Sequence, residues 1–245
     1  MKSQLSKDSN RVVLVTGGAI RIGAAIADEL AKAGWSVIVH FNRSCEEADA
    51  LCTHLRLYGE HAWSVAADLS LSNSAQALFA DTLKLSGRLD AIVNNAALFS
   101  LKRDLSDHDR ARMLSVNVQQ PAQLTHSLFN HLNSRQAKGS VVNLLDQRIA
   151  RVAMEAAPPY EQSKLLLAQA TVAEARAFAP VLRINAVAPG AILCPAEVAA
   201  KEPAGRFPLG CRPTPADVAS AVRWLLESEA VTGQTLYVDG GQHLL

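Results

Sequence analysis

The sequence predicts a single α/β domain: a doubly wound parallel sheet of about seven strands with helices on both faces. Along all 245 residues, apolar segments of strand length alternate with amphipathic segments of helix length. The first strand segments are apolar on both faces, as in strands that helices cover on both sides. Hydrophobic residues make up 49% of the chain and no linker or repeat divides it, so we expect one domain over residues 1–245.

Strand and helix segments follow one another from residue 11 onward. Strands are predicted over Arg11–Thr16, Ser36–His40, Ala62–Ala66, Ala91–Asn94, Ser140–Leu144, Leu182–Val187 and Thr235–Val238. Helices are predicted near Ile20–Ala33, Cys45–Leu57, Leu71–Leu85, Leu114–Leu132, Tyr160–Ala177 and Pro215–Leu226. Right-handed crossovers in this order place a ligand beyond the carboxyl ends of the strands, where the winding of the sheet reverses.

Charge and composition argue against several other classes of protein. The chain has 24 basic and 23 acidic residues, so no overall charge favours nucleic acid or an anionic membrane. Met1–Asn10 lacks the apolar core of a signal peptide, and no apolar stretch reaches the roughly 18 residues of a membrane span. The cysteines form no metal-like or redox pair (Cys45, Cys52, Cys194 and Cys211). We therefore expect a reduced, cytoplasmic protein without a metal site.

A glycine-rich segment, Thr16–Gly23, joins the first predicted strand to the first helix. Glycine permits a sharp turn and a close approach of the backbone to a pyrophosphate, which the N–H groups of the helix start can bind. This position in an alternating pattern indicates a dinucleotide site, although a tight turn without a ligand is the alternative. The candidate contacts are Gly17, Arg21, Ile22 and Gly23.

The end of the second predicted strand indicates which dinucleotide is bound. NAD sites usually place an acid there for the ribose hydroxyls, but this chain has no acid before Glu46. Arg43 can bind a 2′-phosphate through two N–H groups and Ser44 can donate to it, which favours NADPH. A solvated arginine beside a helix cap is the alternative. The candidate contacts are His40, Asn42, Arg43 and Ser44.

Tyr160 and Lys164 are four residues apart at the start of a predicted helix, so both side chains lie on one face. An ammonium group near a phenol stabilises the phenolate and lowers the phenol pKa from about 10. The pair therefore predicts a tyrosine that acts as a general acid. An unrelated surface pair is the alternative reading of these two residues alone.

Several separated motifs resemble those of short-chain dehydrogenases/reductases over essentially the whole chain. They are the glycine loop, Asp68-Leu69, Asn94-Asn95-Ala96-Ala97, Asn117, Tyr160 with Lys164, and Pro189-Gly190. The resemblance implies a single-domain Rossmann fold and a homotetramer, to which the apolar segments 165–177 and 231–245 could contribute contacts.

The resemblance also implies roles for particular residues. Asp68 and Leu69 would flank the adenine, and Asn95, Ala96 and Ala97 would line the cofactor cleft. Asn117 would hold a water in a proton relay, and Lys164 would also hold the nicotinamide ribose. Pro189, Gly190 and Ile192 would contact the nicotinamide. Each of these roles is an expectation from the family pattern.

At two positions the chain departs from the general family pattern and resembles pteridine reductases and bacterial dihydromonapterin reductases instead. Arg21 replaces the middle glycine of the loop, and Asp146 replaces the usual catalytic serine. This resemblance implies that Arg21 reaches toward a pterin or dihydrofolate substrate, that Phe99 stacks on its ring, and that Asp146 and Tyr160 deliver protons. A turn cap at Asp146 and a core aromatic at Phe99 are the alternatives.

Three features depart from the pteridine reductases or give no substrate information: Ala97 replaces a serine, Pro158-Pro159 stiffens the entry to the catalytic helix, and Leu193–Pro213 resembles a variable substrate loop. Two other functions therefore stay open. One is a general carbonyl or 3-oxoacyl-thioester reductase, against which Arg21 and Asp146 count. The other is a non-catalytic NADPH-binding regulator, against which the Tyr160–Lys164 pair counts.

Overall fold

The chain folds around one seven-stranded parallel sheet, which confirms the predicted fold class. A computed structural model describes residues 11–59, 61–100, 102–192 and 205–245. The strand order is β3-β2-β1-β4-β5-β6-β7, so the winding reverses between β1 and β4. The strands are β1 (Val12–Val15), β2 (Ser36–Phe41), β3 (Ala62–Ala66), β4 (Ala91–Asn94), β5 (Gly139–Leu144), β6 (Leu182–Pro189) and β7 (Thr235–Val238).

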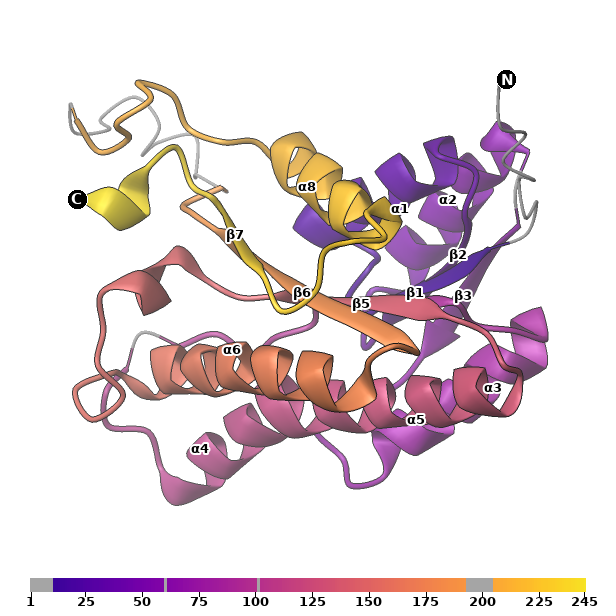
Figure 1. Cartoon of the computed structure of the whole chain (residues 1–245), viewed down its shortest axis with the longest axis horizontal. Helices are drawn as coiled ribbons and strands as arrows, with labels where there is room; N and C mark the ends of the chain where they lie inside the picture. The colour runs from indigo at the N-terminus through magenta and orange to yellow at the C-terminus, as the bar shows by residue number, and fades with distance from the viewer. Residues whose placement is uncertain (1–10, 60, 101, 193–204) are drawn as a thin grey trace.

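Helices cover both faces of the sheet, as Figure 1 shows. One face packs against α1 (Arg21–Lys32), α2 (Cys45–Leu55) and α8 (Pro215–Glu227). The opposite face packs against α3 (Ser74–Ser86), α5 (Gln120–Ser134) and α6 (Pro159–Phe178). Three short 3₁₀ turns lie between or after these elements: η1 (Arg56–Tyr58), η3 (Gln147–Ala150) and η4 (Gln242–Leu244).

The fully apolar strands explain why two helical layers form. In β1, Val13 and Val15 belong to the core beneath α1 and α8, whereas Val12 and Leu14 belong to the core beneath α5. Successive side chains of a strand point to opposite faces, so an apolar residue at every position needs cover on both sides. All four are buried, which places β1 at the centre of both cores.

Most predicted element bounds agree with the structure, and β3, β4 and β7 have the predicted residues. The prediction near Leu114–Leu132 was incomplete, because a separate helix, α4 (Asp107–Leu114), precedes it. Its sequence, DHDRARML, is mostly polar and has no apolar stripe that the helical period would reveal. Ser106 caps α4 by accepting a 3.1 Å hydrogen bond from the Asp109 N–H.

A π-helical turn, η2 (Ser115–Gln119), connects α4 to α5. It turns Asn117 inward, while Leu124, Leu128 and Leu132 of α5 bury completely against the sheet. The four-residue spacing of these leucines keeps them on one helical face. The π-helical turn thus determines both the inward position of Asn117 and the rotation of α5 about its axis.

The polypeptide segments that carry the candidate site lie at the carboxyl edge of the sheet, where the loops after β1, β4, β5 and β6 meet the carboxyl-terminal turn (Figure 1). Residues 1–10 and 193–204, which include the expected polar opening and most of the variable loop, lie outside the described residues. No helix in the described part of the chain is long and apolar enough to cross a membrane.

Candidate active site

The glycine loop after β1 is held closely against the segment that follows β4. Gly17 has a φ of +59°, which glycine adopts without strain, and a Cβ on Gly23 would overlap the Gly17 carbonyl oxygen. The Asn95 side-chain amide donates 2.9 Å hydrogen bonds to the carbonyls of Thr16 and Gly17. The Thr16 hydroxyl accepts from the Ala96 N–H at 3.0 Å. Asn95 and Ala96 therefore shape the loop from behind.

The start of α1 fits an anionic pyrophosphate. Ile20 is the N-cap residue and makes no side-chain hydrogen bond to the helix, and the first turn contains no acidic residue. The partial positive charge of this helix end is thus left for a ligand. Arg21 has a left-handed φ of +57° and an exposed side chain, and Ile22 is half-buried behind it.

His40 lies beneath the loop rather than on its surface. Its Nδ1 accepts a 3.0 Å hydrogen bond from the Gly17 N–H, so Nε2 carries the proton that is donated to the Ala67 carbonyl at 3.1 Å. Burial lowers the pKa of His40 to about 4, which keeps the ring neutral. His40 supports the loop, while the neighbouring Asn42 and Arg43 side chains are exposed to a ligand.

The two residues expected beside the adenine follow β3. Asp68 accepts a 2.8 Å hydrogen bond from the Ser70 N–H, and hydrogen bonds from Ser70 lower the pKa of the Asp68 carboxyl. The charges of Arg112 and Arg43 lower this pKa as well. Leu69 is buried in the core beside β3. Ser44 is the N-cap residue of α2 and makes no side-chain cap bond.

Asn117 joins the loop after β4 to the catalytic helix. Its side-chain amide donates to the Leu98 carbonyl at 2.9 Å and to Ser163 Oγ at 3.0 Å, and its Oδ1 accepts from the Leu98 N–H at 2.8 Å. Asn117 is buried. These contacts fix the segment that carries Ala97, whose surface is exposed, against α6.

Asp146 links the end of β5 to the head of α6. Its Oδ2 accepts a 3.3 Å hydrogen bond from the Tyr160 hydroxyl, and its Oδ1 accepts from the Arg148 N–H at 3.0 Å. The carboxylate therefore caps the short helix η3 with one oxygen and contacts the tyrosine with the other. Asp146 therefore caps the turn and accepts the hydrogen bond of Tyr160 at the same time.

The expectation that Lys164 lowers the pKa of Tyr160 is wrong for this structure. Burial and the adjacent Asp146 carboxylate raise the pKa of Tyr160, so the phenol keeps its proton. The Lys164 Nζ lies 5.8 Å from the Tyr160 ring centroid and donates a 2.7 Å hydrogen bond to the Leu144 carbonyl. Burial lowers the pKa of Lys164 to about 8, which weakens its charge above that pH.

Phe99 stands over Tyr160 rather than in the core. The two rings meet edge to face with centroids 4.8 Å apart, and 57% of the Phe99 surface is exposed. An aromatic ring held in this way offers a free face for a flat substrate. The guanidinium of Arg148 lies 5.5 Å from the Phe99 ring centroid.

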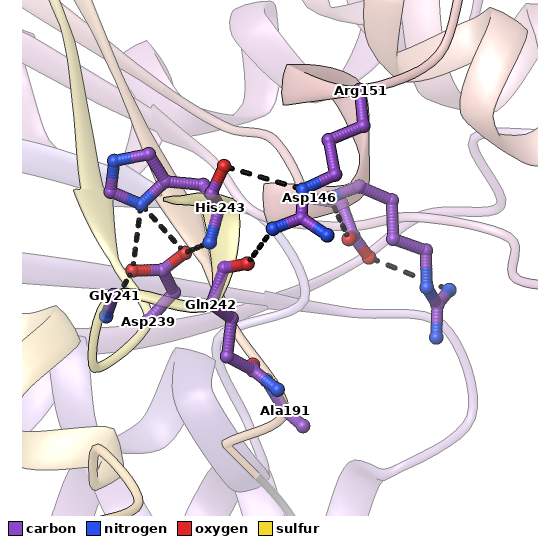
Figure 2. Close-up of polar contacts among 8 residues, drawn as sticks. Asp146, Arg151, Ala191, Asp239, Gly241, Gln242 and His243 are labelled. Atoms are coloured by element: carbon purple, nitrogen blue, oxygen red, sulfur yellow. Dashed lines mark hydrogen bonds and ion pairs between the residues drawn. The ribbon is translucent and has the colours of Figure 1, made fainter. Parts of the chain in front are cut away.

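The segment after β6 closes the far side of the site. A Cβ on Gly190 would come within 2.7 Å of the Asp239 Cβ, so only glycine fits there. Gln242 Oε1 accepts from the Ala191 N–H at 3.0 Å, as seen in Figure 2. Pro189 ends β6, and Ile192 is buried in the core beneath α8.

Sequence reasoning missed Arg148, Ser163 and Gln242, which contact the predicted residues. Ser163 follows Tyr160 by three residues, a helical spacing that could have indicated a shared face. Gln242 is 51 residues from its partner and carries no local signal. Across residues 11–59, 61–100, 102–192 and 205–245, no group of histidine, cysteine, aspartate and glutamate could hold a metal ion.

The parallel sheet, the glycine loop and the Tyr160–Lys164 helix together define a dinucleotide-binding oxidoreductase fold. A family model described as enoyl-(acyl carrier protein) reductase matches residues 18–243. The chain belongs to the short-chain dehydrogenase/reductase family.

Relatives across nearly the whole chain have diverse activities. Glucose 1-dehydrogenase 2 of Bacillus subtilis (strain 168) is 32% identical over 250 residues, covering 96% of both chains. A putative ketoacyl reductase 2 of the granaticin polyketide synthase from Streptomyces violaceoruber is 35% identical and also covers 96% of both. The structure of FolM alternative dihydrofolate reductase 1 from Brucella canis, complexed with NADP, has a TM-score of 0.88 and 35% identity, covering 97% of this chain and 96% of that one.

Proposed function

We propose that this protein is an NADPH-dependent reductase whose substrate contains a pterin ring. The substrate is a pterin, a dihydropterin or dihydrofolate. The observation that carries the proposal is the contact of Asp146 with the Tyr160 hydroxyl, beneath the exposed Phe99 ring. A flat heterocycle with ring nitrogens can use both the stacking face and the proton donor. The structural likeness to a protein described as an alternative dihydrofolate reductase supports the same conclusion.

The cofactor would be held by residues from three loops and by Lys164 of α6. The uncapped start of α1 and the glycine loop fit the pyrophosphate, and Arg43 with Asn42 and Ser44 fits the 2′-phosphate. Lys164 and the segment from Pro189 to Ile192 would hold the nicotinamide end. When bound, NADPH supplies the hydride. The NADP in the structure of the Brucella canis relative supports this choice of cofactor.

In the proposed reaction, this chain positions the ring and supplies a proton. Phe99 orients the ring by stacking, and Arg21 extends from the loop toward it. The raised pKa of Tyr160 means that its hydroxyl is protonated at neutral pH. In the reaction, this proton passes to a ring nitrogen of the substrate. Asp146 accepts the hydrogen bond of that hydroxyl and directs it. Tyr160 then recovers its proton from solvent, and Asp146 again accepts the hydrogen bond of the hydroxyl.

General carbonyl reduction is the second candidate function. The ketoacyl-reductase relative and the description of the matching family model favour it. The replacement of the usual serine by Asp146 counts against it, because an ionised carboxylate has no proton to donate to a carbonyl oxygen. A non-catalytic NADPH-binding regulator would keep the cofactor contacts but show no turnover with either substrate class.

One substrate panel separates these functions. NADPH oxidation is followed with dihydrobiopterin, dihydromonapterin, dihydrofolate and a simple diketone, for the parent protein and for Asp146→Ser. We expect the parent to reduce at least one pterin and Asp146→Ser to lose most of that activity. A parent and variant that both reduce the diketone and ignore every pterin would refute the pterin assignment. Tight NADPH binding without turnover of any compound would favour the regulator.

We also propose a cytoplasmic homotetramer. On α6, Leu166 and Val172 are exposed, as are Leu244 and Leu245 at the end of the chain. Exposed apolar residues on a long helix favour a contact with a second copy. Light scattering at micromolar concentration should give four times the chain mass of 26.2 kDa, and a monomeric mass would contradict the proposal.

A further inference from the structure

A cavity near the Phe99–Tyr160 pair has three arginines among its lining residues. It has a volume of about 340 Å³, within the roughly 300–1,000 Å³ of small-ligand pockets. Its charged wall consists of Arg148, Arg151, Arg206 and Glu161. Among the described residues that line it, arginines therefore outnumber carboxylates.

Arg148 joins this cavity to the candidate active site. Its guanidinium lies 5.5 Å from the Phe99 ring centroid, and its Nη1 is 3.8 Å from Asp146 Oδ2. Glu161 follows Tyr160 directly in α6. Arg148 therefore lies both beside the Phe99 ring and in the wall of the cavity.

The Nη1 of Arg148 is buried and has no hydrogen-bond acceptor in the described part of the chain. The 3.8 Å separation from Asp146 is an ion pair but exceeds hydrogen-bond length. A buried N–H group without an acceptor is unfavourable, and a charged one more so. Because Nη1 itself has almost no exposed surface, an anionic oxygen in the cavity would meet the other N–H groups of Arg148, which lines the cavity.

Arg151, which also lines the cavity, is held in place by the carboxyl-terminal turn. Its Nη2 donates to the Gln242 carbonyl at 2.8 Å and its Nε to the His243 carbonyl at 3.3 Å, as Figure 2 shows. These bonds fix the guanidinium against the carboxyl-terminal turn η4. A fixed planar guanidinium loses little entropy when it binds an oxyanion through two N–H groups.

We propose that this cavity binds an anionic group, a carboxylate or a phosphate, on the side chain of the substrate. The inference rests on the pterin reductase function proposed above and specifies its substrate as one with an acidic side chain. The ring occupies the face of Phe99, and the acidic group lies between Arg148 and Arg151. A dihydrofolate, with its two carboxylates, or a dihydropterin phosphorylated on its side chain has this chemistry.

The test compares acidic and neutral substrates in Arg151→Ala and Arg206→Ala, with Arg151→Lys as the conservative variant. Arg135→Ala removes an exposed arginine at the end of α5 and serves as the control for lost charge. For Arg151→Ala, we expect the KM for dihydrofolate and for the phosphorylated dihydropterin to rise at least fivefold. The KM for neutral dihydrobiopterin and kcat should change less than twofold. Arg151→Lys should recover part of the loss, and high salt should weaken only the acidic substrates.

Equal KM changes for acidic and neutral substrates would overturn the inference. A changed mass by light scattering with unchanged selectivity would do the same, and would assign these arginines to a subunit contact. If only one of the two acidic substrates responds, that arm identifies the anion as carboxylate or phosphate.

A binding measurement separates this inference from the proposed function. Calorimetry with p-aminobenzoylglutamate, which has the acidic tail but no pterin ring, needs no turnover. Binding that Arg151→Ala weakens at least fivefold would support the anion site even if no pterin is reduced. Equal or absent binding in the parent and the variant would reject the site even if pterins are reduced.

Discussion

The hydroxyl of Tyr160 donates a 3.3 Å hydrogen bond to Oδ2 of Asp146, whose other oxygen caps the turn that carries Arg148. The Asp146 carboxylate thus fixes the position of the Tyr160 hydroxyl relative to Arg148, which lines the cavity. The general family places a neutral hydroxyl at this position, which can donate to a carbonyl oxygen, whereas an ionised carboxylate only accepts. The side chain at 146 therefore determines whether the Tyr160 proton is shared with an acid.

Tyr160→Phe should nearly abolish turnover and leave NADPH affinity largely intact. The phenol supplies a proton in the transition state and contributes little to ground-state binding. Single-turnover kinetics and a fluorescence titration with NADPH measure the two effects separately. Tyr58→Phe is the control, because it removes an exposed hydroxyl that bonds Asp28 on the surface. Near-normal turnover in Tyr160→Phe would remove this residue from the mechanism.

NADPH should bind at least tenfold more tightly than NADH, a difference of about 1.4 kcal/mol. Arg43→Asp should remove most of that preference, because a carboxylate at this position repels the 2′-phosphate. Dissociation constants from calorimetry give the ratio. Arg135→Asp makes the same charge change at the opposite edge of the sheet and should leave the ratio unchanged. Equal affinities of the parent protein for the two cofactors would contradict the prediction.

Phe99→Ala should reduce kcat/KM for a dihydropterin several-fold, since the loss of a stacking ring costs about 1 kcal/mol or more. Phe99→Leu keeps an apolar side chain but no aromatic face, so it should recover little. Both variants should bind NADPH as the parent does if the ring contacts only the substrate. A Phe99→Leu variant as active as the parent would show that bulk, rather than stacking, is what the substrate needs.

His40 should make the free protein sensitive to acid. Burial lowers its pKa in the folded chain to about 4, below the 6.5 that is ordinary for a histidine in an unfolded chain. Protons therefore bind the unfolded chain more strongly, and the contribution of His40 to stability is complete above pH 6.5. It falls as the pH drops from 6.5 toward 4, by roughly 3 kcal/mol in total.

Urea unfolding without cofactor across this pH range checks the His40 prediction. His40→Asn keeps an acceptor for the Gly17 N–H but has no proton to gain, so its stability should fall less steeply with acid. Carboxylates that lose stability in the same range do so in both proteins, and the difference between the two curves isolates His40. Parallel curves would mean that His40 is not the sensitive group.

The sequence predicted the sheet well because its strands are short, apolar and bounded by polar turns, as at Ala91–Asn94. The glycine loop and the Tyr160–Lys164 pair were also readable, since their chemistry depends on local spacing. The polar helix α4 was missed because capping by Ser106, rather than an apolar face, marks its start. The pKa of Tyr160 was predicted in the wrong direction because burial depends on the whole fold.

The arginine-lined cavity had no signal in the sequence. Arg151 donates to the Gln242 carbonyl, 91 residues away in the chain. Every residue has a backbone carbonyl, so no particular residue type marks this acceptor in the sequence. The buried Nη1 of Arg148 depends on the path of the chain after β5, which a local pattern does not encode. Contacts of this kind become visible only once the segments are placed in space.

The π-helical turn at Ser115–Gln119 also governs which sequence lengths this region can accept. Each residue of a helix advances the side chains by about 100°, so the turn sets the phase of every later position in α5. Removing one residue there would rotate Leu124, Leu128 and Leu132 away from the sheet even though each remains in the chain. The length of the segment between α4 and α5 is therefore part of what positions these leucines.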